Sequence, residues 1–131
     1  MATIRDVEKI IARLPEVTEG ERYGNRSWSV GKKAFAWERA FSKADLKRFG
    51  DETPPDGPIL AVAVADLGEK EAVLAAHPEA LFTIPHFDGF AAVLVQLTKV
   101  SVKVLRETIE DGWLAQAPAK VADQHLAKKK H

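Results

Sequence analysis

Residues 27–38 read SWSVGKKAFAWE, and this pattern predicts a β-hairpin. Apolar and polar residues alternate in its first four positions, and the bulky Phe35 and Trp37 alternate with alanines near its end. The two residues between these segments, Gly31 and Lys32, are typical of a tight turn. The two strands are therefore expected to pair antiparallel, with a basic tip.

The elements on either side of this hairpin are predicted from apolar periodicity, capping residues and turn residues. They are, in chain order, a helix over about residues 4–14, a short helix that begins after Ser42 and includes Phe49, a strand over residues 59–65, a helix over about residues 67–76, strand-like segments over residues 81–86 and 91–97, and a helix that begins after Ser101 and ends near Pro118. The two strand-like segments flank an Asp88-Gly89 pair, whose glycine supplies the positive φ of a tight reversal. A second β-hairpin is therefore expected.

This order of elements predicts a single α+β domain, because strands joined by tight turns pair antiparallel. Within each strand the larger apolar residues, among them Trp28, Phe35 and Trp37, fall on alternate positions. We therefore expect an antiparallel sheet with two β-hairpins and with helices packed on one face. The domain is assigned to residues 1–121, and residues 122–131 are expected to form a basic C-terminal tail that frays.

The composition excludes several classes of protein. Of the 131 residues, 46% are hydrophobic and 29% are charged, which is typical of a globular domain. The 19 basic and 19 acidic residues cancel, so no net charge attracts the molecule to nucleic acid or to anionic membranes. The chain has no cysteine for a disulfide and no apolar run of membrane-spanning length. A cytoplasmic, monomeric protein without a membrane partner is expected.

The first hairpin carries a candidate nucleic-acid site. Arg26, Lys32 and Lys33 are suited to contact phosphates, and Trp28 or Trp37 is suited to stack on a base if its ring is exposed. In the alternative interpretation the lysines keep an exposed hairpin soluble while the tryptophans belong to the core. Taken alone, these residues favour the second interpretation.

A second candidate site lies at the turn of the second hairpin. His86 and Asp88 are two positions apart, a spacing that suits an imidazole oriented for proton transfer or metal binding. A metal site needs three or four ligands, however, and the other histidines have no motif spacing to His86. An aspartate that caps the turn beside a structural histidine is the better supported interpretation. Signatures of phosphate loops, dinucleotide sites and catalytic nucleophiles are missing, so we expect no catalytic residue, metal or cofactor.

Four segments together resemble a known family. They are LPEVTEG at residues 14–20, YGNRSWSVG at residues 23–31, FTIPHFDGFAAVLV at residues 82–95, and Trp113 with Ala117-Pro118. In this combination, and above all in the T-x-P-H-x-D-G block, the chain is similar to the MmcQ/YjbR family. The resemblance implies a YjbR/CyaY-like α+β fold, whose two hairpins would be the wings of a double-wing DNA-binding motif. Frataxin-like proteins share this kind of fold, but basic side chains interrupt the first helix here, so no iron site is expected.

Two functional hypotheses follow. The first is a non-enzymatic DNA-binding protein that contacts the phosphate backbone through its basic hairpin, and the neutral chain then implies weak, salt-sensitive binding. The second is a small-molecule or protein-interaction module that uses a cleft near Tyr23, His86 and Asp88, because polar and aromatic residues gather in these two turns.

Overall fold

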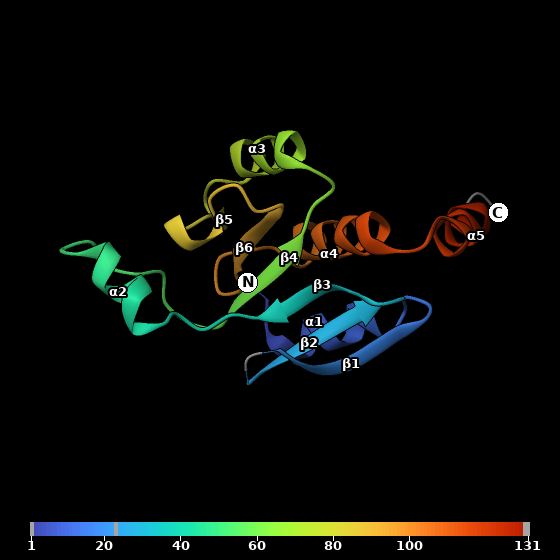
Figure 1. The fold of residues 1–131 in the computed structure, drawn as a ribbon, viewed down its shortest axis with the longest axis horizontal. Helices are drawn as coiled ribbons and strands as arrows, with labels where there is room; N and C mark the ends of the chain where they lie inside the picture. The colour runs from blue at the N-terminus through green and yellow to red at the C-terminus, as the bar shows by residue number, and fades with distance from the viewer. Residues whose placement is uncertain (1, 23, 130–131) are drawn as a thin grey trace.

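Six strands form one antiparallel sheet in the computed structural model, which describes residues 2–22 and 24–129 (Figure 1). Their order across the sheet is β1-β2-β3-β4-β6-β5. The strands are β1 (Val17–Arg22), β2 (Asn25–Val30), β3 (Lys33–Glu38), β4 (Ile59–Ala63), β5 (Leu81–Phe82) and β6 (Ala92–Gln96). Each neighbouring pair runs antiparallel, which confirms the predicted α+β class and the first β-hairpin.

The described residues also form five α-helices and one 3-10 helix. They are α1 (Ile4–Ile11), α2 (Lys43–Phe49), α3 (Leu67–Ala76), the 3-10 helix η1 (Pro85–Phe87), α4 (Val102–Gln116) and α5 (Ala119–Lys129). Thr3 and Ser42 each form a reciprocal capping box with the aspartate three residues later. Asp66 and Ser101 cap α3 and α4, because their side chains accept a backbone N–H in the first turn. The helices predicted from these caps are confirmed.

The larger apolar cluster lies on one face of the sheet. Buried residues of α1 and α4, among them Val7, Ile109 and Trp113, pack against Leu60 and Val62 of β4. Apolar surface removed from water in this way is the main source of stability for such a domain. The expected packing of helices on one face is therefore present.

The opposite face of the central strands is covered as well. Ile59 and Ala61 of β4 face a second cluster that includes Phe87, with Phe41 and Phe49 packed at its edge. Strand β4 is consequently buried along its whole length. Figure 1 shows α2 and α5 at opposite ends of the long axis of the molecule.

A β-bulge in β3 changes the face on which Trp37 lies. Trp28 of β2 pairs with Ala36, and the next residue of β2 pairs with Ala34, so Phe35 is an extra residue on β3. One extra residue reverses the alternation of side chains beyond it. Phe35 therefore belongs to the larger cluster, whereas Trp37 belongs to the second cluster on the opposite face. The predicted shared face of Phe35 and Trp37 is wrong for this reason.

Strand β1 is not predicted from the sequence. Five of its six residues are exposed, so no apolar alternation marks it as a strand. It lies at the edge of the sheet, and its pairing with β2, from Val17 opposite Val30 to Arg22 opposite Asn25, holds it in place.

The second hairpin is shorter than predicted. Leu81 pairs with Val95 and Phe82 with Leu94, but β5 ends there. Pro85 starts η1, and proline has no N–H to donate to a strand ladder. The connecting segment folds against the sheet, and Phe87 is buried there instead of projecting on a free wing.

Residues 122–129 are helical, where a frayed tail was expected. Helix α5 runs from Ala119 to Lys129, so the boundary placed after residue 121 falls inside it. His125 explains the contact of α5 with α4, because its Nε2 lies 3.3 Å from Oε2 of Glu110 and its ring centroid lies 4.9 Å from that of Trp113. Residues 130–131 lie outside the described residues.

Candidate functional site

Arg26, a predicted phosphate contact, is surrounded by carboxylates. Its Nη2 lies 3.0 Å from Oε2 of Glu8 and 3.0 Å from Oε1 of Glu19, and its Nη1 lies 3.8 Å from Oε1 of Glu38. The hydrogen bond from Arg26 lowers the pKa of the Glu19 carboxyl. A phosphate bound at Arg26 has to compete with three acidic side chains that already compensate its charge.

Trp28, the predicted stacking residue, belongs to the core. It is only 3% exposed, its Nε1 donates a hydrogen bond of 3.2 Å to Oε1 of Glu19, and the Arg26 guanidinium lies 4.9 Å from its ring centroid. A buried ring cannot present its face to a base, so the structure corrects this part of the predicted nucleic-acid site.

Lys32 and Lys33 are both exposed at the tip of the first hairpin, as predicted. Gly31 in this turn has a φ of +62°, and a Cβ built there would lie 3.2 Å from Cγ of Pro118. The hairpin tip is therefore seated beside the start of α5. Lys120, in the first turn of α5, is exposed.

A groove of about 730 Å³ lies at the other end of this hairpin, and it is rich in arginine. It is bounded by the end of β1, the chain that follows β3, helix α2 and helix η1. Its lining residues are Arg22, Asn25, Trp37, Arg39, Ala40, Ser42, Ala44, Asp45, Arg48, His86, Phe87 and Phe90. We call this surface the arginine groove.

Two guanidinium groups lie over aromatic rings in the arginine groove. Arg22 Cζ is 4.8 Å from the centroid of Trp37, and Arg39 Cζ is 5.6 Å from the centroid of Phe87. Trp37 and Phe87 are buried, whereas Phe90 is 43% exposed and packs edge-on against Phe87. The groove thus combines cations placed over buried rings with the exposed ring of Phe90.

Asp45 is the one carboxylate among the described residues that line the arginine groove. Its Oδ2 lies 2.9 Å from Nη2 of Arg39 and 2.9 Å from the backbone N of Ser42, which donates to it. The carboxylate is thus shared between an ion pair and the cap of α2. The lining as a whole carries three guanidinium groups against this single acid, which favours an anionic ligand.

The turn that follows η1 forms one wall of the groove. Gly89 has a φ of +75°, and the N–H of Phe90 donates to the carbonyl of Phe87 at 3.0 Å. This positive φ confirms the reversal predicted at the Asp-Gly pair. Lys70 of α3 reaches the same turn, because its Nζ donates to the carbonyl oxygens of Phe87 at 2.7 Å and Phe90 at 2.9 Å.

The residues proposed for the alternative cleft separate in the structure. His86 lines the arginine groove, but Asp88 is not among the lining residues, and its charge acts on the Lys70 ammonium instead. Tyr23 lies outside the described residues, although its neighbour Arg22 and the nearby Asn25 both line the groove. The structure thus brings His86 beside Arg22 and Asn25 around one cleft, whereas Asp88 is exposed outside its lining.

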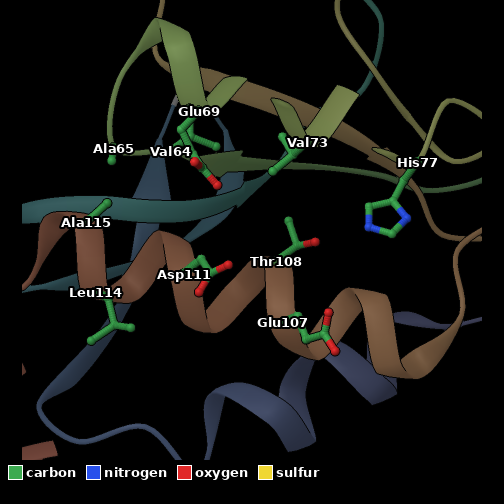
Figure 2. Close-up of a pocket in the computed structure, with 10 residues that line it drawn as sticks. All are labelled: Val64, Ala65, Glu69, Val73, His77, Glu107, Thr108, Asp111, Leu114 and Ala115. Atoms are coloured by element: carbon green, nitrogen blue, oxygen red, sulfur yellow. The ribbon is translucent and has the colours of Figure 1, made fainter. Parts of the chain in front are cut away.

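A second pocket, of about 420 Å³, lies between α3 and α4 and is acidic. Figure 2 shows Glu69 of α3 and His77, which follows the last residue of α3, on one side, and Glu107 and Asp111 of α4 on the other. Its apolar wall includes Val73. Among the described residues, no group of three or more His, Cys, Asp or Glu side chains could hold a metal ion. No helix within the described part of the chain is long and apolar enough to cross a membrane.

Comparison with known proteins identifies the family. A family model described as YjbR matches residues 12–115. The chain belongs to the YjbR family. The matched range contains every described residue that lines the arginine groove, and the predicted resemblance to this family is confirmed.

Relatives extend the YjbR match over nearly the whole chain. The uncharacterized protein Rv2570 of Mycobacterium tuberculosis and the uncharacterized protein Mb2600 of Mycobacterium bovis are each 45% identical to it over 130 residues, covering 97% of this chain and 98% of theirs. The crystal structure of Deinococcus radiodurans protein DR2400, with a DUF419 family-model domain, has a TM-score of 0.63 and 21% identity. It covers 87% of this chain and 78% of that one, which shows a shared fold.

Most of the arginine groove is not predicted from the sequence. Arg22 is on β1, Arg39 follows β3 and Arg48 is on α2, and the three form no motif. The cluster of turn residues in the family-like segments indicated His86, and the aromatic pattern of the first hairpin indicated Trp37. Lys70 is visible in the sequence only as the single basic residue in an acidic stretch.

Proposed function

We propose that this protein of the YjbR family is a binding protein without catalytic activity, and that its ligand is an anion attached to a planar ring, such as a nucleotide. The observation that carries this proposal is the lining of the arginine groove, which includes Arg22, Arg39 and Arg48 and, among its described residues, one carboxylate. Guanidinium groups bind phosphate in a bidentate manner and also stack on planar rings.

The aromatic residues support a ring on the ligand. Arg22 and Arg39 each lie over a buried ring, so their planes are held in position and can stack on a base with the outer face. Phe90 and His86 are exposed beside them and add aromatic surface. An anion without a ring would contact the guanidinium groups but not this aromatic surface.

The side chains favour binding over chemistry. Ser42 carries the hydroxyl of the described lining, and its Oγ accepts the N–H of Asp45 to cap α2. The Asp45 carboxylate is engaged by Arg39. Neither group is arranged as a nucleophile beside a general base, which supports a role in binding alone.

The test is a titration of the ¹⁵N-labelled protein, followed by NMR, with adenosine monophosphate, adenosine and inorganic phosphate in separate experiments. Adenosine monophosphate should bind more tightly than either part, with shifts centred on the residues of the groove. Arg48→Ala should weaken this binding about tenfold through loss of a charged hydrogen bond. Lys47→Ala removes the same charge from the same helix outside the groove and serves as the control.

Two results would contradict the groove as an anion site: no saturable shift with adenosine monophosphate, or an equal loss of affinity in both variants. A single-stranded oligodeoxynucleotide titrated in parallel tells a free nucleotide from a nucleic-acid chain. Tighter binding of the longer ligand, with a strong dependence on salt, would assign the groove to nucleic acid.

Duplex DNA is the second candidate ligand, and the exposed pair Lys32 and Lys33 supports it. Both side chains are exposed at the hairpin tip, where Gly31 lies beside Pro118, and Lys120, two residues after Pro118, is exposed as well. Contact with the phosphate backbone through so few cations implies dissociation constants of about 10⁻⁴ to 10⁻⁶ M at physiological salt. Lys32→Glu combined with Lys33→Glu should abolish it, whereas unchanged affinity or an absence of salt dependence would rule it out.

A further inference from the structure

Lys70 is a buried lysine that contacts the turn forming one wall of the arginine groove. It is 6% exposed, and it lies on α3, outside the lining of the arginine groove. Its Nζ donates to two carbonyl oxygens of one turn, those of Phe87 and Phe90. Lysine is almost never buried without such partners, so this arrangement requires a reason.

The turn that Lys70 holds is not well supported by strand pairing. Strand β5 ends at Phe82, and the chain re-enters the sheet only at Ala92. Within residues 84–90, backbone hydrogen bonds such as Phe90 N–H to the carbonyl of Phe87 are local, and the sheet is met again where the carbonyl of Ala91 accepts from the N–H of Val64 at 3.0 Å. The ammonium of Lys70 is a contact from a distant element that ties both ends of this turn to α3.

The charge of Lys70 is balanced within the same turn. Burial lowers the pKa of the Lys70 ammonium, and the negative charge of Asp88 opposes part of this shift. Asp88 lies between Phe87 and Phe90 in the sequence, so the turn supplies both the acceptors and the counter-charge. The turn therefore matches the Lys70 ammonium both in hydrogen bonding and in charge.

We propose that Lys70 is a positioning residue for the arginine groove, which holds the turn of residues 84–90 so that His86, Phe87 and Phe90 face the guanidinium groups. Its effect on ligand affinity rests on the proposed function. Its effect on the turn does not, because the conformation of the turn can be measured without a ligand.

The experiment compares Lys70→Met, which keeps the length of the side chain, with Lys70→Arg, which restores donors and charge. Lys103→Met removes the same charge from an exposed site on α4 and is the control. Hydrogen exchange is measured at the N–H groups of Asp88 and Phe90, which donate within the turn, and at Val62 in β4.

In Lys70→Met the turn amides should exchange about tenfold faster or more, while Val62 keeps a rate set by global unfolding. The side-chain NMR signals of His86 and Phe90 should shift, and Lys70→Arg should recover part of both effects. The control should match the unmodified protein. Unchanged turn exchange, or an equal acceleration at Val62, would overturn the positioning role.

Ligand titrations of the same variants distinguish a failure of the positioning role from a failure of the proposed function. If the unmodified protein binds adenosine monophosphate, Lys70→Met should lower the affinity by about the same factor by which it accelerates the exchange of the turn amides. Undiminished affinity despite a loosened turn would overturn the positioning of the groove by Lys70. If the unmodified protein binds none of the probes, the proposed function fails, and the exchange data still decide whether Lys70 holds the turn.

Discussion

Asp45 and Arg39 form an ion pair at the start of α2, with 2.9 Å between Oδ2 and Nη2, in which the Asp45 side chain is only 2% exposed and the Arg39 side chain 16%. Burial raises the pKa of the Asp45 carboxyl, but its hydrogen bonds with Ser42 and the pair with Arg39 outweigh burial, so the net pKa is lowered. One carboxylate thus caps α2 and holds an arginine of the groove.

Asp45→Asn should lower the free energy of unfolding by about 1–3 kcal/mol at neutral pH, because hydrogen bonds to a charged group are lost. An acid whose pKa is lowered by folding stabilises the protein above its unfolded pKa of about 3.9, and this contribution is lost as pH falls through the lower folded pKa. Urea unfolding should therefore show that the free energies of unfolding of Asp45→Asn and of the unmodified protein differ less at about pH 3 than at neutral pH. If the difference in the free energy of unfolding were the same at both pH values, the lowered pKa of Asp45 would be contradicted. Asp51→Asn in the exposed loop is the control.

Gly112→Ala should destabilise the fold strongly. A Cβ at this position of α4 would lie 2.7 Å from Cγ1 of Val62 and 2.8 Å from the carbonyl oxygen of Ala63. Relieving such overlap against a backbone atom requires the helix to move off the sheet, at a cost of about 1–3 kcal/mol. Thermal unfolding measures this, with Gly68→Ala in α3 as the control, because its Cβ would meet Asp66 only at 3.4 Å. Equal stability of both variants would contradict the close approach of α4.

Trp28→Ala should act on stability and not on recognition. Its ring is 3% exposed in the larger cluster, and truncation of such a residue costs about 3–5 kcal/mol. Urea unfolding measures the loss, and Leu46→Ala, at a side chain that is 47% exposed, should change stability little. If Trp28→Ala folded with unchanged stability and lost affinity for single-stranded DNA, the ring would have to be a stacking surface after all.

Arg26→Gln should leave the salt dependence of duplex DNA binding unchanged, because three carboxylates already compensate this cation. Replacing Lys32 or Lys33 by Gln should instead reduce the slope of log affinity against log salt by about one for each lysine. Fluorescence anisotropy over a range of salt concentrations measures these slopes. A reduced slope for Arg26→Gln would show that the arginine leaves its ion pairs to contact phosphate.

Much of the fold could be predicted because its signals are local. Turn residues placed the first hairpin, and capping residues placed the starts of the helices, since both depend on a few neighbouring residues. The exceptions have identifiable causes. Strand β1 is exposed and carries no apolar pattern, and α5 is held by the contact of His125 with Glu110 and Trp113 on another helix.

The candidate site was predicted only in part, for a related reason. His86 could be selected because it stands in a family-like turn, whereas Arg22, Arg39 and Arg48 carry no motif. The stacking role of Trp28 depended on its exposure, which a sequence does not contain.

The sequence by itself determined the α+β class, the hairpin turn at Gly31 and the reversal at Gly89, because short-range backbone geometry decides which conformations these residues adopt. The tertiary structure alone decided which side chains meet across elements. The bulge at Phe35 placed Trp37 on the opposite face of the sheet. Strand order brought Glu19 and Glu38 beside Arg26, and the packing of α1 brought Glu8 there. Contacts of this kind depend on distances through space between segments far apart in the chain, and no local pattern encodes them.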